Sequence, residues 1–216
     1  MKHAVLLDGG FVKPLFRKAF GRRIEARDVL ALAHSLSRTH SANHDLLRIY
    51  YYDSPSLEAK VTKPISNTTL NFKSGEVYDH QLRLFRELKC SDFVSVREGT
   101  LAFRGWKLKR TALNALRKQG GDSPTFTDDS FEPNIQQKGV DTKLGLDMAW
   151  IAFNSVVDRV ILVTGDSDFV PAIRAARRNG VQVISSTLNH GIVESLRNNA
   201  DVIDESEIPQ LMTPAS

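Results

Sequence analysis

Aspartates follow two apolar runs that lie far apart in the chain. Val160–Val163 leads into Thr164-Gly165-Asp166-Ser167-Asp168, and Ala4–Leu7 leads into Asp8-Gly9-Gly10. In open α/β sheets, ligands bind in the crevice outside the carboxyl ends of the strands. The two runs therefore predict an acidic cluster that the fold assembles from distant segments.

Two more aspartates belong to a predicted helix over residues 142–154. Asp141 ends the run Lys138-Gly139-Val140-Asp141 at or before the start of this helix, and Asp147 lies six residues further on. If both were helical, they would differ by about 120° around the axis and about 9 Å along it, so one ion could not easily bind both. Asp141 is a primary candidate for the cluster and Asp147 a secondary one.

Each of these carboxylates also has a plainer interpretation. Ser167 or Asp168 can cap a helix, and Pro171 fits the first turn of such a helix. Asp141 can serve as an N-cap, and Asp8 can end a strand against turn amides. Capping does not account for carboxylates on both sides of Ser167, so both interpretations remain open at this point.

Carboxylates that converge from Asp8, Asp141, Asp166 and Asp168 would repel one another unless a cation neutralised them. Hard oxygen ligands favour Mg²⁺ or Mn²⁺ over zinc. Such an ion lowers the pKa of a bound water and stabilises charge on a phosphate, which matches phosphodiester hydrolysis. Ser167 can bind phosphate through its hydroxyl, whereas His190 fits a cap or surface role better.

Other site classes find less support. A phosphatase of the haloacid dehalogenase type would need an aspartate where this chain has Gly10, and no Gly-rich Walker loop is present, so no cofactor-binding residues are predicted. The single Cys90 excludes an intramolecular disulfide and a cysteine-based zinc site. No apolar run approaches the roughly 20 residues that span a bilayer, and the N-terminus does not resemble a signal peptide. We expect a cytoplasmic protein without a membrane partner.

Basic residues gather in two blocks although the net charge is only +4. Residues 13–23 and 104–118 contain five and six basic residues, respectively, and no acid. Such blocks attract polyanions, and Trp106 can stack on a base or belong to a core. The residues predicted to bind phosphate or RNA are Lys13, Arg17, Lys107, Lys109, Arg110, Lys138 and Ser167.

The 216 residues, 41% of them hydrophobic, alternate between predicted strands and helices. This alternation predicts an α/β sandwich with a mainly parallel sheet and helices on both faces. One domain is expected over 1–206, with 104–140 as a basic-then-acidic insertion or long loop and 207–216 as a C-terminal tail. The predicted strands are 3–8, 46–53, 159–164 and 181–185, with one or two more over 93–103 broken near Gly99, and the predicted helices are 11–19, 25–38, 79–89, 142–154, 168–178 and 191–198.

Three motifs resemble the NYN domain family, the LabA-like branch of the PIN-domain-like nucleases. They are Leu7-Asp8-Gly9-Gly10-Phe11, Lys138-Gly139-Val140-Asp141, and Val163-Thr164-Gly165-Asp166-Ser167-Asp168-Phe169 followed by Gly180-Val181-Gln182-Val183; a weaker match follows over residues 189–201. The resemblance implies a Rossmann-like three-layer sandwich of PIN type and metal-dependent ribonuclease activity. Its acidic positions correspond to Asp8, Asp141, Asp166 and Asp168, with Asp147 at a further one. Many members have an asparagine where this chain has Phe11.

The resulting interpretation is a Mg²⁺- or Mn²⁺-dependent ribonuclease that binds single-stranded or structured RNA. Asp8, Asp141 and Asp166 would bind metal, and Asp168 would bind metal or orient water. The alternatives are a non-catalytic RNA-binding or regulatory protein of the same fold and, with less support, a phosphatase or nucleotide-binding module. The sequence leaves a homodimer open.

Overall fold

The computed structural model describes residues 1–213 apart from 44, 119–124 and 192. The chain folds into two compact units. The first comprises Met1–Asp53, Leu84–Gly99 and Gly139–Ser216, and the second comprises Ser54–Arg83 and Thr100–Lys138. The motif aspartates all belong to the first unit.

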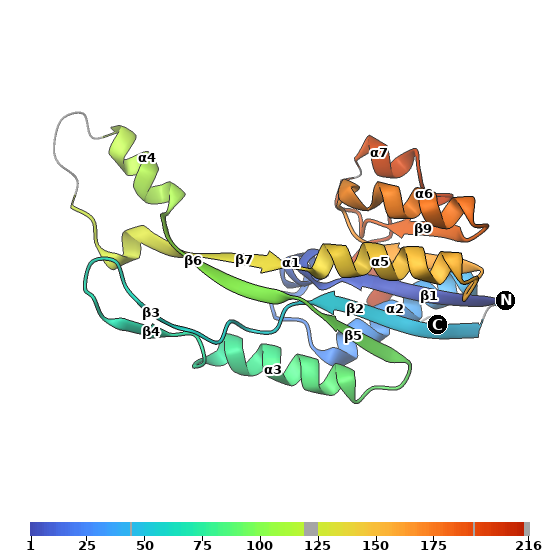
Figure 1. Cartoon of the computed structure of the whole chain (residues 1–216), viewed down its shortest axis with the longest axis horizontal. Coiled ribbons are helices and arrows are strands. Elements are labelled where there is room, and N and C mark those ends of the chain that lie inside the picture. The colour runs from blue at the N-terminus through green and yellow to red at the C-terminus, as the bar shows by residue number, and fades with distance from the viewer. Residues whose placement is uncertain (44, 119–124, 192, 214–216) are drawn as a thin grey trace. The chain divides into compact units, whose positions relative to one another are not determined.

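A six-stranded parallel sheet forms the centre of the first unit, with the strand order β10-β9-β8-β1-β2-β5 (Figure 1). Its strands are short and apolar on both faces, as expected of a sheet covered by helices on each side. The α/β prediction is thereby confirmed. The strands are β1 (Lys2–Asp8), β2 (Asp45–Asp53), β5 (Val94–Glu98), β8 (Arg159–Val163), β9 (Gln182–Ser186) and β10 (Val202–Asp204).

Helices cover both faces of this sheet because successive side chains of each strand point to opposite sides. Val5 and Leu7 pack against α1 (Gly9–Phe20), α2 (Ala26–Ser41), the end of α3 (Glu76–Lys89) and α8 (Ile208–Met212). Ala4 and Leu6 pack on the other side against α5 (Val140–Phe153), α6 (Val170–Arg178) and α7 (Glu194–Arg197). No helix within the described ranges is both long and apolar enough to cross a membrane.

The chain leaves the centre of the sheet in two directions. From β1 it continues to β2 and β5 on one side, and from β8 it continues to β9 and β10 on the other. Adjacent parallel strands whose connections diverge create a crevice at their carboxyl ends, and open α/β sheets bind ligands there. Asp8 and Thr164 follow the two strands that flank this crevice.

Several expected elements differ from those observed. The helix predicted over 168–178 begins with a 3-10 turn, η2 (Ser167–Phe169), before α6. Of the helix predicted over 191–198, residue 192 lies outside the described residues and α7 forms the later part. The expected tail 207–216 contains α8, because Ile208 and Leu211 are three residues apart and bury the same face. Residues 214–216 lie outside the described part of the chain.

The second unit contains two antiparallel strand pairs. β3 (Lys60–Thr62) pairs with β4 (Thr69–Asn71), and β6 (Thr100–Leu108) pairs with β7 (Phe131–Lys138). The helix α4 (Arg110–Lys118) and the 3-10 turn η1 (Asp128–Ser130) lie between β6 and β7. The segment 104–140, expected as an insertion or long loop, therefore consists largely of regular elements where it is described. Its residues 119–124 lie outside the described residues, and the single domain over 1–206 stays a prediction.

Candidate functional site

Asp8 ends β1 and caps α1. Its Oδ1 accepts hydrogen bonds from the amides of Gly10, at 2.9 Å, and Phe11, at 3.3 Å. Its Oδ2 accepts a hydrogen bond from the hydroxyl of Thr164, at 3.3 Å, so the carboxylate also joins the ends of β1 and β8. The capping interpretation therefore holds for Asp8, but the cap places a half-buried carboxylate at the crevice.

Two glycines allow the backbone to approach closely at this point. A Cβ atom on Gly9 would lie 2.7 Å from the hydroxyl oxygen of Tyr51 and 2.9 Å from the Cβ of Asp53. A Cβ atom on Gly165 would lie 2.6 Å from a ring carbon of Phe11. Glycine is therefore needed just after each of the two strands that border the crevice, β1 and β8.

Asp166 and Asp168 occupy the turn that follows β8. Asp166 caps η2, since its Oδ1 accepts a hydrogen bond from the amide of Asp168 at 2.9 Å. The amide of Asp166 donates to the hydroxyl of Thr164 at 3.2 Å, which connects this turn to the oxygen that holds Asp8. Both carboxylates are exposed, and Ser167 between them is half-buried. The cap uses only the backbone of Asp168, not its carboxylate.

Asp141 lies in the first turn of α5, on an exposed position after Gly139. Partial burial raises the pKa of Asp141 above its ordinary value, and the negative charges of Asp166 and Asp168 raise it further. Burial likewise raises the pKa of Asp8 and outweighs the hydrogen bonds that lower it, and the negative charge of Asp141 adds a smaller increase. The fold thus brings Asp141 within electrostatic reach of the other three predicted aspartates.

Asp147 lies further along α5 and has other partners. Its Oδ2 accepts hydrogen bonds from the Arg97 guanidinium at 2.8 Å and from the Tyr52 hydroxyl at 3.0 Å. This ion pair satisfies a carboxylate in a nearly apolar helix, and the Arg97 guanidinium also lies over the Tyr50 ring at 5.4 Å. The contacts give Asp147 a structural role, whereas its role as a secondary metal ligand stays a prediction.

Asp53 is a carboxylate at the sheet edge that the sequence-based prediction missed. It ends β2 and is only 2% exposed. The ammonium of Lys13 lies 2.6 Å from its Oδ2, and the Tyr51 hydroxyl donates to the same atom at 3.3 Å. The signal was present, because Asp53 ends a strand-like run as Asp8 does, but the following Ser54-Pro55 suggested only a turn. Lys13, predicted to bind RNA, is engaged with this buried carboxylate.

The other predicted basic residues lie on both units. Arg17 is exposed on α1 of the first unit. In the second unit, the ammonium of Lys107 lies 3.1 Å from a Glu132 carboxylate oxygen. Lys138 and Arg110 are exposed there, and Lys109 is half-buried.

Trp106 has a packing role within the second unit. Its indole N–H donates to the Thr62 carbonyl at 2.8 Å, and its ring contacts Phe103 edge-on at 5.7 Å. The side chain is half-buried. These contacts favour the core interpretation of Trp106, which the sequence alone left equal to base stacking.

The chemistry of the acidic cluster fits a hard divalent cation, since its donors are carboxylate oxygens that repel one another without one. Among the described residues, no group of three or more His, Cys, Asp or Glu side chains is arranged to hold a metal ion together. Mg²⁺ usually keeps several waters and binds only one or two protein carboxylates directly. The aspartates therefore fit a largely hydrated ion rather than a closed protein cage.

Part of the chain is similar in sequence to a known protein, and nearly the whole chain can be superposed on solved structures. A curated protein of Methanocaldococcus jannaschii, "Uncharacterized protein MJ0482", is 38% identical over 73 residues, which are 34% of this chain and 30% of that protein. The chain thus matches less than a third of this relative's length. A protein of unknown function from Vibrio parahaemolyticus, VPA0982, has a TM-score of 0.48 at 18% identity, over 94% of this chain and 91% of its own. A Sir2 protein bound to acetylated peptide has a TM-score of 0.37 at 12% identity, over 98% and 90% of the two chains. Both TM-scores are below 0.5, so neither structure supports a conclusion about the fold or function of this chain.

The family comparison covers more than half of the chain. Residues 83–207 match the NYN domain, and this span includes Asp141, Asp166 and Asp168 but not Asp8. The expected resemblance is thereby confirmed. The chain belongs to the NYN domain family, a family of PIN-like nucleases.

Proposed function

We propose that this protein is a metal-dependent ribonuclease that hydrolyses RNA phosphodiester bonds at Asp8, Asp141, Asp166 and Asp168. The observation that carries the proposal is the mutual repulsion of these carboxylates beside the crevice between β1 and β8. Burial and neighbouring negative charge raise the pKa values of Asp8 and Asp141. Ionisable groups whose pKa values are shifted by burial and by neighbouring charges occur often at functional sites.

Each residue has a distinct part in the proposed reaction. When bound, Mg²⁺ or Mn²⁺ supplies an activated water and neutralises charge on the phosphate. Asp141 and Asp166 would hold the ion. Asp8, whose carboxylate accepts hydrogen bonds from the Gly10 and Phe11 amides and the Thr164 hydroxyl, would hold the ion with these two aspartates. Asp168 would hold the ion or orient the attacking water.

Basic and hydroxyl side chains would bind the RNA backbone. Arg17 is exposed on α1, the helix that Asp8 caps, and Ser167 lies between two of the candidate ligands. Lys109, Arg110 and Lys138 are further candidates, whereas Lys13 and Lys107 would first have to leave their carboxylate partners. Contacts of this kind make affinity fall steeply with salt concentration.

A second candidate function is RNA binding without cleavage. It is supported by Phe11, which stands where many family members have an asparagine. Both functions require RNA affinity, so the two are distinguished by whether the protein cleaves RNA.

The test compares Asp166→Asn with the wild-type chain and with Asp92→Asn, an exposed aspartate in the turn before β5. Cleavage of a labelled RNA is measured with Mg²⁺, with Mn²⁺ and with EDTA. We expect Asp166→Asn to lose at least about a hundredfold in rate, because even the outer partners of metal ligands cost up to about that much. Asp92→Asn should cleave like the wild type.

Metal binding is followed separately through the thermal unfolding midpoint. An ion that binds only the folded chain raises this midpoint. Mn²⁺ should raise it for the wild type and Asp92→Asn, and less for Asp166→Asn. Cleavage that persists in EDTA or in Asp166→Asn would contradict the proposed ribonuclease. RNA affinity and a Mn²⁺ effect without any products would instead favour the second function.

A further inference from the structure

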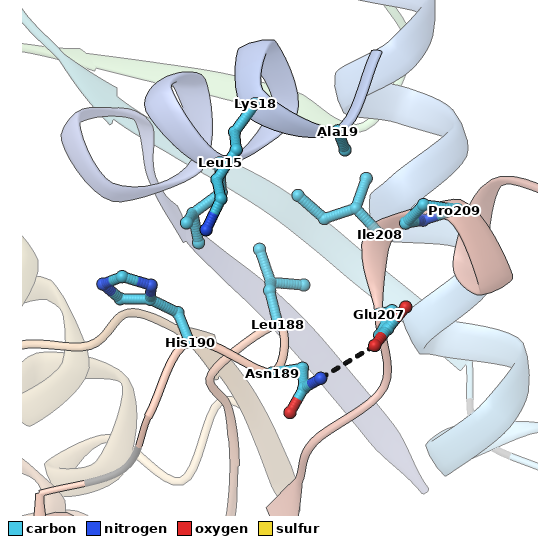
Figure 2. Close-up of a pocket in the computed structure, with 9 residues that line it drawn as sticks. All are labelled: Leu15, Lys18, Ala19, Leu188, Asn189, His190, Glu207, Ile208 and Pro209. Atoms are coloured by element: carbon cyan, nitrogen blue, oxygen red, sulfur yellow. Dashed lines mark hydrogen bonds between the residues drawn. The ribbon is translucent and has the colours of Figure 1, made fainter.

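A pocket of about 300 Å³ lies on the first unit, between α1, the turn after β9 and the start of α8. Figure 2 shows Leu188 in its centre, facing Leu15 and Ile208. These side chains make an apolar interior of a size at the lower end of ligand-binding pockets.

The two ends of the pocket differ in chemistry. His190 and Lys18 lie together at one end (Figure 2). At the other end, the Asn189 side-chain amide donates to Glu207 Oε1 at 2.8 Å. Polar groups at the ends of an apolar cavity suit a planar ligand with apolar faces and polar edges, as nucleobases are.

Phe11 connects this pocket to the acidic cluster. Its amide donates to Asp8, and its ring lies against Gly165, the residue before Asp166. The same ring contacts the His190 ring edge-on, with 5.9 Å between the centroids. The cationic end of the pocket is therefore separated from the aspartates by a single aromatic side chain.

The turn that forms the pocket wall has an unusual backbone. Leu188 and Asn189 have φ angles of 50° and 55°, in the left-handed region. Asparagine adopts this conformation readily but leucine rarely does, and such rare positions cluster at functional sites. Here the conformation directs Leu188 into the pocket and places His190 beside Phe11.

We infer that this pocket binds the base of the nucleotide next to the scissile phosphate of single-stranded RNA. The inference rests on the proposed function and adds a base subsite to it. The base would lie on Leu188 between Leu15 and Ile208, and His190 would supply an aromatic contact. Lys18 would bind the adjoining phosphate. Base contacts with aromatic side chains tolerate any base, since every base has a π-face.

Much of the pocket lies outside the residues that match the NYN domain. Leu15, Lys18 and Ala19 precede the residues that match the NYN domain, and Ile208 and Pro209 follow them. Phe11, which also lies outside that match, provides the aromatic contact to His190 in place of an asparagine.

The experiment titrates the Asp166→Asn protein with the four 5′-nucleoside monophosphates and follows the histidine ring protons by NMR. His190 is assigned through His190→Ala, and exposed His34 on α2 serves as the internal control. We expect the His190 resonances to shift in a saturable way and those of His34 to stay unchanged. Ala19→Leu, which fills the pocket from an exposed position, should weaken binding on the order of tenfold.

The variants also separate this inference from the ribonuclease proposal. In an otherwise wild-type chain, Ala19→Leu should weaken the binding of single-stranded RNA about tenfold and leave metal-dependent products detectable. The base subsite is wrong if His190 does not shift with any monophosphate, or if Ala19→Leu leaves the shift and its saturation unchanged. Saturable binding in a chain that never cleaves RNA would support the pocket and contradict the nuclease.

Discussion

At the scale of single residues, Asp8 shows that the acidic cluster lowers the stability of the folded protein. Its backbone hydrogen bonds satisfy the start of α1, which favours the side chain, but burial and Asp141 disfavour its negative charge. The net effect is a raised pKa, so the ionised group opposes folding. Active sites often retain such unfavourable groups because function requires them.

Asp8→Asn should stabilise the metal-free protein at pH 7. Asparagine caps a helix about as well as aspartate and carries no charge. The pKa of Asp8 is higher in the folded than in the unfolded protein, so protonated Asp8 stabilises the wild type. This stabilisation is fully present below the unfolded pKa and is lost as the pH rises through the folded pKa. The advantage of asparagine should therefore shrink toward pH 4. Urea unfolding at several pH values measures it.

Asp8→Ala is the matched variant, because it removes both the charge and the cap. Losing the cap costs about 0.5–2 kcal/mol, so Asp8→Ala should be less stable than Asp8→Asn at every pH. Equal stabilities for these two variants would mean that the side chain does not cap α1. A lower stability of Asp8→Asn than of the wild type at pH 7 would mean that its ionised form is not disfavoured.

At the scale of elements, glycines decide how closely helices and strands meet at the crevice. Gly9 begins α1 directly against Tyr51, a fully buried side chain of β2. Gly145 lies inside α5, where an added Cβ would meet nothing within 4 Å. Replacing glycine by alanine should therefore change the stability of the protein in opposite directions at the two positions.

Gly9→Ala should destabilise the protein by about 1–3 kcal/mol, the usual cost of forcing extra volume into a packed site. The shift of Tyr51 would also disturb Asp53 and its ion pair with Lys13. Gly145→Ala should stabilise by up to about 1 kcal/mol through helix propensity. Chemical unfolding midpoints of the two variants test this. Similar effects of the same sign would show that close approach at Gly9 is not required.

At the scale of the whole molecule, a buried carboxylate connects the far edge of the sheet to α2. Asp204 of β10 is 6% exposed, and it accepts hydrogen bonds from the hydroxyls of Ser186 and Ser206, each at 2.6 Å. His40 Nε2 lies 3.3 Å from its Oδ1. Burial alone would raise the pKa of Asp204, but these three partners outweigh it and lower the pKa to about 2.

Asp204→Asn should lose about 2 kcal/mol of unfolding free energy at pH 6, from about 1.4 kcal/mol for each tenfold change in proton affinity. Because the folded pKa is depressed, the stabilisation is present above the unfolded pKa and is lost as the pH falls through about 2. The difference from the wild type should therefore narrow from pH 4 downward. Urea unfolding of both proteins, with Asp92→Asn as control, tests it. A difference that does not change with pH would contradict the assignment.

Local patterns in the sequence were enough to predict most of the longer strands and helices of the first unit. Apolar runs at 3–8, 46–53 and 159–164 correspond to β1, β2 and β8, because a strand buried on both faces must be apolar throughout. The apolar residues of α2 recur at helical spacing, so this helix follows from the sequence as well. Short elements such as β3, β10 and α8 carry too few residues for a pattern, and their packing partners decide whether they form.

The candidate aspartates could also be identified from the sequence. A carboxylate directly after a buried strand indicates a possible site at the end of the sheet, whatever the position of that strand in the sheet. Which of them come together depends on distances that no local pattern contains. Tertiary packing places Asp141 near Asp166 and Asp168, while it pairs Asp147 with Arg97 and Asp53 with Lys13. The residues of the pocket come from positions 15–19 and 188–209, and only the packing of α1 and α8 beside the turn after β9 brings them together. Residue type and order thus determine which groups can do chemistry, whereas long-range burial decides which of them meet.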